Sequence, residues 1–367
     1  MKRAAAAAIS LMTGLAMLTG CSRAEVEETI QPLVADAIEE SDSEAEAVKE
    51  EDESPLIPEI DTDIKIHAGS RIAVVSKCVK GEYWKMVKKG MEDAVKEINK
   101  AYGYKKDDQI TMTFEGPDNE EDVETQINTI DAVIAENPDV LCISASDMDS
   151  CEAQLEAAKE NGIPVIAFDS NVAEKKLVKA YRGTDNVQVG KMAAYQLGSA
   201  LGKMGKVAVF SAQQKTKSIQ DRVEGFMNNI GKYGDIEVVE TIYSDQVDDM
   251  EASMKEVLEK YPTLDGVFCT NAEITEMYLN LEKSDEHDAP ALVGVDATTK
   301  QQEAIRNGEE IGCVSQQPYA MGYQTIWAAV ETTAPKKSVV IEKNVLSNPA
   351  WIDADCLDDP DYSGYLY

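Results

Sequence analysis

The stretch that decides the fold is residues 72–101, IAVVSKCVKGEYWKMVKKGMEDAVKEINKA. It begins with four apolar residues that favour β structure, Ile72 to Val75, and continues through a polar loop into a longer segment from Tyr83 to Ala101. In that segment the apolar residues recur every three or four positions, which is the period of an amphipathic helix. The stretch therefore predicts one βα unit.

The same alternation repeats along the chain. Further apolar runs that predict strands lie near residues 110–114, 140–143, 165–168, 178–181, 207–210, 236–242, 266–270, 292–295 and 311–315. Repeated βαβ units with continuously apolar strands indicate parallel sheets that are covered on both faces. Roughly ten strands are more than one sheet usually holds, so the predicted fold class is α/β, with two doubly wound parallel-sheet lobes.

Polar and aromatic residues follow many of these strands. They are Lys77 to Trp84, Ser144 to Asp147, Asp169 to Asn171, Thr184 to Asn186, Asn271, Asp296 and Gln316. Any one of them taken alone is explained better by helix capping or by a turn than by ligand contact. In doubly wound sheets, however, ligands bind beyond the carboxyl ends of the strands, and two facing lobes form a cleft there. We therefore expect these residues to line a ligand cleft between the lobes.

Charge and composition argue against several classes of function. The 367-residue chain has a formal net charge of −33, so we expect no nucleic acid or anionic lipid surface as a partner, because both are bound by clustered Lys and Arg. His67 and His287 are its two histidines, too few for a multi-histidine metal site and a poor basis for a catalytic triad. No glycine-rich nucleotide loop occurs in the right context. We expect neither enzyme activity nor a cofactor or metal.

The first 21 residues predict an export signal. Lys2 and Arg3 precede an apolar run, Ala4 to Leu18, that is too short to span a bilayer. The run ends in Leu18-Thr-Gly-Cys21, which resembles the lipobox of bacterial lipoproteins; that resemblance implies removal of residues 1–20 and acylation of Cys21. An ordinary secretory signal with a cysteine nearby is the alternative. We expect the mature protein to be lipid-anchored on the extracytoplasmic face of the cell membrane.

An acidic segment follows the signal. Residues 22–60 contain fourteen acidic residues against Arg23 and Lys49, and no aromatic residue. Such a segment buries too little apolar surface to fold, and its like charges extend it. We expect residues 21–61 to be a disordered tether that holds the folded part away from the membrane.

From about Arg71 onward the chain resembles the periplasmic sugar-binding proteins of ABC transporters, in the ribose-binding-like branch of the type I fold. The segments that carry the resemblance are 72–76 with Tyr83 and Trp84, 161–169, 183–186 with Gly190, 221–226, 267–271, 293–296 and 314–318. The resemblance implies three hinge crossings, near Thr184 and Asp185, near Gln316 and Gln317, and near Val345 to Ser347. The N-terminal lobe would then comprise residues 62–184 and 317–345, and the C-terminal lobe residues 185–316 and 346–367.

The resemblance also implies which side chains bind the ligand. Tyr83 and Trp84 match the family's stacking pair, although Trp84 also fits the core of its helix. Asp169 and Asp296 match aspartates that accept sugar hydroxyls, and Arg222, otherwise a surface arginine, matches the family's arginine. The remaining matches are Asn271 and Gln316, the family's amides, and Ser144, which stands where ribose-binding members have asparagine. Flat aromatics and charged or planar polar groups suit the apolar faces and hydroxyl rim of a sugar.

At two positions the sequence departs from the ribose-binding pattern, and both bear on which ligand is bound. Ser170 replaces an arginine that ribose-binding members have after the first aspartate, and Gln246 lies where they have a further aromatic residue. We therefore expect another pentose, a hexose, a polyol or another small polar molecule rather than ribose. The expected function is a monomeric receptor that closes over this solute and delivers it to an ABC permease. The alternative is a sensor subunit that presents the bound sugar to a sensor kinase or chemoreceptor.

Overall fold

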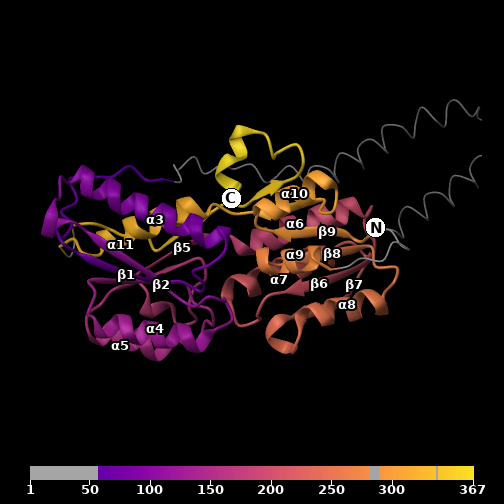
Figure 1. Cartoon of the computed structure of the whole chain (residues 1–367), viewed down its shortest axis with the longest axis horizontal. Helices are drawn as coiled ribbons and strands as arrows, with labels where there is room; N and C mark the ends of the chain where they lie inside the picture. Colours follow the sequence, from indigo (N-terminus) through magenta and orange to yellow (C-terminus); the bar gives the residue numbers. More distant parts are fainter. Residues whose placement is uncertain (1–56, 282–288, 336–337) are drawn as a thin grey trace, which may run out of the picture. The chain divides into compact units, whose positions relative to one another are not determined.

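The computed structural model describes residues 57–281, 289–335 and 338–367. The predictions for the signal, Cys21 and most of the tether lie outside these described residues. Within them the chain forms two six-stranded sheets with helices on both faces (Figure 1). The predicted fold class is thereby confirmed. One boundary shifts, because Ile60, at the end of the predicted tether, packs against the core of the first lobe.

The first sheet is entirely parallel. Its strands, in spatial order, are β11 (Asn344–Ser347), β5 (Ala180–Thr184), β4 (Val165–Phe168), β3 (Val140–Ile143), β1 (Arg71–Val75) and β2 (Thr111–Glu115). Helices α3 (Glu82–Ala101) and α11 (Pro318–Glu331) cover one face, and α4 (Val123–Ala135) and α5 (Glu152–Glu160) cover the other. Two short 3₁₀ turns, η1 (Lys106–Asp108) and η2 (Lys175–Leu177), lie in its loops.

The second sheet repeats this plan with one antiparallel edge strand. Its order is β12 (Ala350–Ile352), β10 (Gly312–Ser315), β9 (Ala291–Val295), β8 (Gly266–Cys269), β6 (Met204–Ser211) and β7 (Asp235–Tyr243), with β12 antiparallel to β10. Its helices are α6 (Asn186–Ala200), α7 (Lys217–Ile230), α8 (Met250–Lys260), α9 (Ala272–Leu279) and α10 (Thr299–Asn307), with 3₁₀ turns η3 (Ser244–Gln246) and η4 (Pro360–Tyr365).

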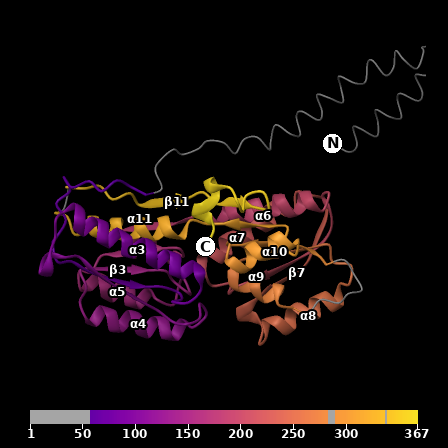
Figure 2. The ribbon, with the colours of Figure 1, turned by 45° about the horizontal axis from the view of Figure 1, so that its top comes forward.

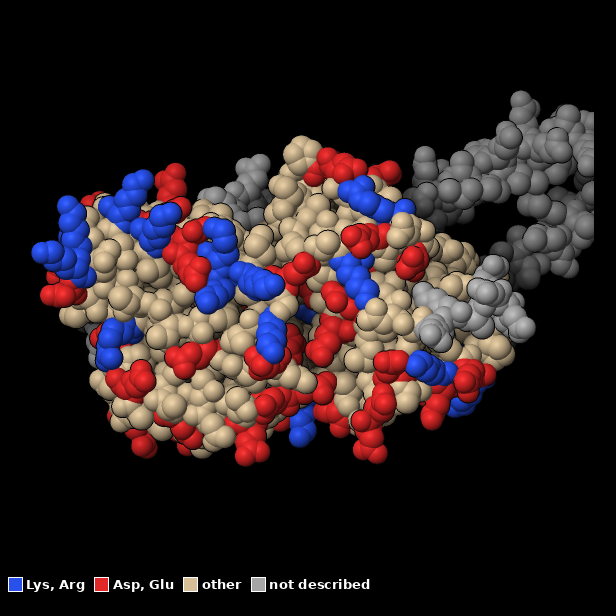
Figure 3. Space-filling view, viewed as in Figure 1, with Lys and Arg blue, Asp and Glu red and all other residues tan. Residues whose placement is uncertain are grey.

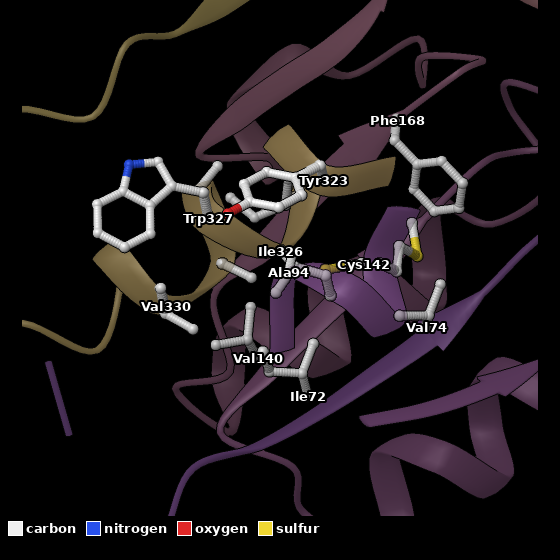
Figure 4. Close-up of a cluster of buried hydrophobic side chains, with 14 of the residues drawn as sticks. Ile72, Val74, Ala94, Val140, Cys142, Phe168, Tyr323, Ile326, Trp327 and Val330 are labelled. Carbon is white, nitrogen blue, oxygen red and sulfur yellow. The ribbon is translucent and has the colours of Figure 1, made fainter. Parts of the chain in front are cut away.

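Alternate residues of each strand pack on opposite faces, which explains the continuously apolar strands. In β1, Ile72 and Val74 pack toward α3 and α11, whereas Ala73 and Val75 pack toward α4 and α5. Figure 4 shows the strand residues Ile72, Val74 and Val140 in one cluster with Tyr323, Ile326, Trp327 and Val330 of α11. Helix α11 thus helps complete the core of the first lobe although it follows β10 of the second sheet in sequence.

Glycines allow one pair of helices in each lobe to cross at close range. A Cβ on Gly90 of α3 would lie 2.0 Å from the backbone oxygen of Tyr319, and one on Gly322 of α11 would lie 2.1 Å from that of Val87. In the second lobe, a Cβ on Gly190 of α6 would likewise meet the backbone of α7, and a Cβ on Gly225 of α7 would meet the backbone of α6. Figures 1 and 2 both show α11 beside α3 and α6 beside α7.

Three connections join the lobes. Two run where the sequence placed them, through Asp185 between β5 and α6 and through Gln316 and Gln317 between β10 and α11. The third does not, because β11 occupies 344–347 and pairs with β5 in the first sheet. The chain therefore crosses at Asn348 and Pro349, just after the predicted segment. Strands β11 and β12 were not predicted, since each is only three or four residues long and partly exposed.

Acidic side chains are spread over both lobes on the face shown in Figure 3, as the net charge leads one to expect. Among the described helices, none combines the length and the apolar character needed to cross a membrane.

Candidate ligand-binding cleft

A pocket of about 340 Å³ lies where the carboxyl ends of strands from both sheets meet. This volume falls in the range of small-molecule sites. Seven of the eight predicted ligand residues line it: Tyr83, Trp84, Asp169, Arg222, Asn271, Asp296 and Gln316. The eighth, Ser144, is fully buried and does not line the pocket; its hydroxyl donates a hydrogen bond to Asp169 Oδ2 at 2.7 Å. It thus supports a pocket residue from outside the cavity.

Asp169 organises the part of the pocket that belongs to the first lobe. It directly follows β4 with a left-handed φ of 54°, an uncommon conformation for a residue other than glycine. Besides the bond from Ser144, it accepts one from Tyr83 Oη at 2.8 Å and forms an ion pair with Lys77 Nζ at 3.0 Å. Burial alone would raise the pKa of Asp169, but Lys77 and these hydrogen bonds outweigh burial and hold the pKa below its ordinary value. The carboxylate is therefore charged at neutral pH.

Lys77 belongs to the range 77–84 that follows the first predicted strand, but the family resemblance gave it no role in the site. Only 4% of it is exposed, and its ammonium lies 3.4 Å from Ser170 Oγ and 3.6 Å from Glu120 Oε2. Burial lowers its pKa, but the charges of Asp169 and Glu120 outweigh burial and raise it. Lys77, which follows β1, thus places a positive charge beside Ser170, where ribose-binding proteins have an arginine. Its position in the loop after a predicted strand was the only hint in the sequence that it belongs to the site.

The two aromatic residues at the start of α3 lie edge to face. The rings of Tyr83 and Trp84 are 5.2 Å apart at 88°, so they do not form one flat stacking surface. Trp84 packs in the core against Phe168 and also lines the pocket, where its Nε1 donates to Glu120 Oε1 at 2.8 Å. Trp84 therefore belongs both to the core of the first lobe and to the lining of the pocket.

Asp296 occupies the corresponding position in the second lobe. It follows β9 with a φ of 80° and is 4% exposed. Its carboxylate accepts hydrogen bonds from Gln316 Nε2 at 2.7 Å, Tyr367 Oη at 2.8 Å and the backbone N–H of Ala272 at 2.9 Å. A carboxylate has about four acceptor sites, so one remains for a ligand.

Tyr367 was not predicted from the sequence. It lies 71 positions from Asp296 in the chain, and its ring contacts that of Tyr83 edge-on at 5.9 Å. Burial, and then the charge of Asp296, raise the pKa of its phenol well above the ordinary value, so it remains a donor. No local pattern marks this residue.

We expect Tyr367→Phe to weaken ligand binding about tenfold, because a hydrogen bond to a charged group contributes about 1.5–3 kcal/mol and this one holds Asp296 in place. Isothermal titration with the bound solute would measure the change. Tyr261→Phe is the matched control, since its hydroxyl also donates to a carboxylate, Glu240 Oε1 at 3.1 Å, outside the pocket lining. Equal affinities for the two variants would contradict the positioning role of Tyr367.

Three polar atoms of residues that line the pocket accept or donate no hydrogen bond within the described part of the chain. Arg222, 3% exposed on α7, donates from Nε to Asn186 and from Nη1 to the Thr270 carbonyl, which leaves Nη2 unpaired. The side chain of Asn271 caps α9 through Oδ1 and leaves Nδ2 unpaired, and Gln316 leaves Oε1 unpaired. These two donors and one acceptor are therefore suited to a polar ligand, and Arg222 is not a surface arginine.

Polar contacts join the lobes beside the pocket. The hydroxyls of Ser170 and Ser218 are 2.6 Å apart, and the Glu82 carboxylate accepts hydrogen bonds from Thr299 N at 2.7 Å and Thr299 Oγ1 at 3.0 Å. These contacts between the lobes are polar, and each joins only one pair of residues. Lobes that are joined in this way can separate and come together again.

A family model described as a periplasmic binding protein domain matches residues 72–337. The ribose import binding protein RbsB of Bacillus subtilis is 26% identical over 220 residues, which cover 60% of this chain and 71% of that protein. The xylitol-binding protein of Mycolicibacterium smegmatis is 24% identical over 211 residues, 57% of this chain and 60% of that protein.

Solved structures agree with the sequence comparisons. An ABC transporter solute-binding protein from Agrobacterium vitis with bound D-fucose superposes with a TM-score of 0.73 at 26% identity, covering 81% of this chain and 100% of that one. One from Agrobacterium radiobacter in complex with D-arabinose gives a TM-score of 0.71 at 25% identity, covering 82% and 99%. Since the family model spans well over half of the residues, the chain belongs to the family of periplasmic binding protein domains.

Proposed function

We propose that the protein is an extracytoplasmic receptor that binds a sugar or sugar-like polyol between its lobes. The observation that carries this proposal is a set of polar atoms on pocket-lining residues that form no hydrogen bond within the described residues: Arg222 Nη2, Asn271 Nδ2 and Gln316 Oε1. Hydroxyl groups both donate and accept hydrogen bonds, so one polyhydroxylated ligand can satisfy all three. The names and bound ligands of the relatives, which include ribose, xylitol and D-fucose, support the same class.

Binding would proceed by closure of the lobes. A ligand shifts an open form toward a closed one only if it contacts both lobes in the closed form. Asp169 and Tyr83 lie on the first lobe, and Arg222, Asn271 and Asp296 lie on the second, so a ligand in this pocket contacts both. The three short connections would serve as the hinge.

The cellular setting remains part of the proposal. The lipobox-like Leu18 to Cys21 supports a lipid anchor at Cys21, and the acidic segment that follows supports a tether between the anchor and the lobes. We propose that the closed, monomeric receptor delivers its solute to an ABC permease. The similarity to the Agrobacterium vitis protein, which is the solute-binding protein of an ABC transporter, supports this role.

A thermal-shift screen of the full-length protein tests the proposal. Monosaccharides, polyols, nucleosides and amino acids would be compared at equal concentrations. A ligand at about 100 times its dissociation constant adds roughly 2.7 kcal/mol to the free energy of unfolding, so we expect a clear rise in Tm with at least one sugar or polyol. A rise with nucleosides or amino acids alone would overturn the sugar assignment while leaving the fold intact.

A further inference from the structure

The pocket has an excess of negative charge. Its lining includes three cations, Lys77, Lys80 and Arg222, against seven carboxylates, Glu82, Asp118, Glu120, Asp169, Glu273, Glu276 and Asp296. Lys80 pairs with Asp118 at 2.6 Å on the exposed rim, and Lys77 is shared by Asp169 and Glu120. Of the lining cations, only Arg222 has no carboxylate partner among the described residues. The pocket lining therefore carries more negative than positive charge.

Glu273 is the carboxylate whose charge is least compensated. It lies in the first turn of α9 and has neither an ion pair nor a hydrogen bond among the described residues. Glu120, from the loop after β2 in the other lobe, and Glu276, one turn further along α9, line the same pocket, and the charges of both and of Glu121 act on Glu273. Partial burial, and then these three charges, raise the pKa of Glu273 to about 7. Closing the lobes thus brings like charges together at the exposed end of the pocket.

Two kinds of positive group could relieve this repulsion. A metal ion needs several ligands converging on one point, and no group of three or more acidic, histidine or cysteine side chains within the described ranges is placed to hold one. An ammonium group needs no fixed coordination shell, carries three N–H donors and forms strong charge-assisted bonds with carboxylates. A neutral hydroxyl brings no positive charge, so beside it Glu273 would remain partly protonated at neutral pH, as its raised pKa indicates.

The buried end of the pocket points independently to a hydroxylated ligand. Asn271 and Gln316 are 7% and 2% exposed, and each has an unpaired polar atom at the cavity. One molecule that fits both ends carries hydroxyls on one side and a positive charge on the other.

We propose that the solute is a sugar or polyol bearing a protonated amino group, and that the ammonium binds to Glu273 between the facing carboxylates of the two lobes. This inference rests on the proposed function and specifies its ligand class. Binding of the ammonium would also favour closure, since it attracts carboxylates of both lobes to one point.

The experiment compares matched ligand pairs on the full-length protein by isothermal titration at pH 7: D-glucosamine with D-glucose, D-galactosamine with D-galactose, and D-mannosamine with D-mannose. We expect the amino member of at least one pair to bind at least tenfold more tightly than its hydroxyl counterpart. Glu273→Gln should reduce this ratio to below threefold. Glu251→Gln is the matched control, because it removes one exposed carboxylate on α8, where its partner is Lys255, and should keep the ratio.

The outcomes separate the two proposals. Equal or tighter binding of the hydroxyl sugars would overturn the amino-group inference and support the sugar receptor. An amino preference that persists in Glu273→Gln would overturn the assignment of the ammonium to that residue. A failure of all six sugars, with a response to another polyol in the thermal-shift screen, would overturn the amino-sugar inference alone. A response to no sugar or polyol at all would overturn both.

Discussion

Replacing Asp169 by alanine is expected to weaken binding of the solute about 100-fold. The carboxylate accepts hydrogen bonds from Tyr83 and Ser144 and pairs with Lys77, which leaves one acceptor site for a ligand hydroxyl. The variant loses that bond, worth about 1.5–3 kcal/mol, and also releases the buried ammonium of Lys77 from its nearest counter-charge. Isothermal titration with the ligand from the screen would measure the dissociation constant.

Folding must be separated from binding in this test. Urea unfolding of Asp169→Ala should remain cooperative, although the unpaired Lys77 will lower the midpoint. The matched control is Asp248→Ala, which removes an exposed carboxylate outside the pocket lining. If Asp169→Ala binds within threefold of the unsubstituted protein, Asp169 does not contact the ligand and our assignment of the pocket is wrong.

Substitution of Gly190 by alanine is expected to destabilise the second lobe by about 3 kcal/mol, the upper end of the usual cost of overpacking. A Cβ at this position would lie 1.9 Å from the backbone oxygen of Arg222 and 2.6 Å from the backbone nitrogen of Phe226. Both obstacles are backbone atoms of α7, so no side-chain rotation removes the clash. The two helices must move apart, which also displaces Arg222 from the pocket.

Urea unfolding measures the loss of stability, and ligand titration measures the expected loss of affinity. Gly234→Ala is the control, because a Cβ there meets nothing within 4 Å; it should change stability by no more than about 1 kcal/mol. Similar midpoints for the two variants would show that α6 and α7 tolerate a wider crossing than their glycines indicate.

The sequence predicted the strands and helices well because their signal is local. Ile72 to Val75 and the period of the segment up to Ala101 describe elements whose burial is set by their own spacing. Strand β12 escaped prediction because three residues carry no period, and its pairing with β10 depends on a segment that is distant in sequence.

Much of the pocket could also be predicted, for a topological reason. In parallel sheets the carboxyl ends of the strands lie on one edge, so the residues that follow different strands, such as Asp169, Asn271 and Asp296, must approach one another. Their chemistry then indicated a polar ligand before any distance was known. Resemblance to a family added Arg222, which lies on a helix that the strand-end rule does not reach.

The sequence by itself thus determined the class of fold and which strand ends meet at the cleft, because periodicity and strand order are properties of the chain. Only the tertiary structure decided that Lys77 lies beside Ser170, that Tyr367 donates a hydrogen bond to Asp296, and that Glu273 lines the same pocket as Glu120 of the other lobe. Hydrogen bonds and charge interactions depend on distances of a few ångströms between residues far apart in sequence. No pattern of neighbouring residues encodes those distances, so only the folded chain reveals them.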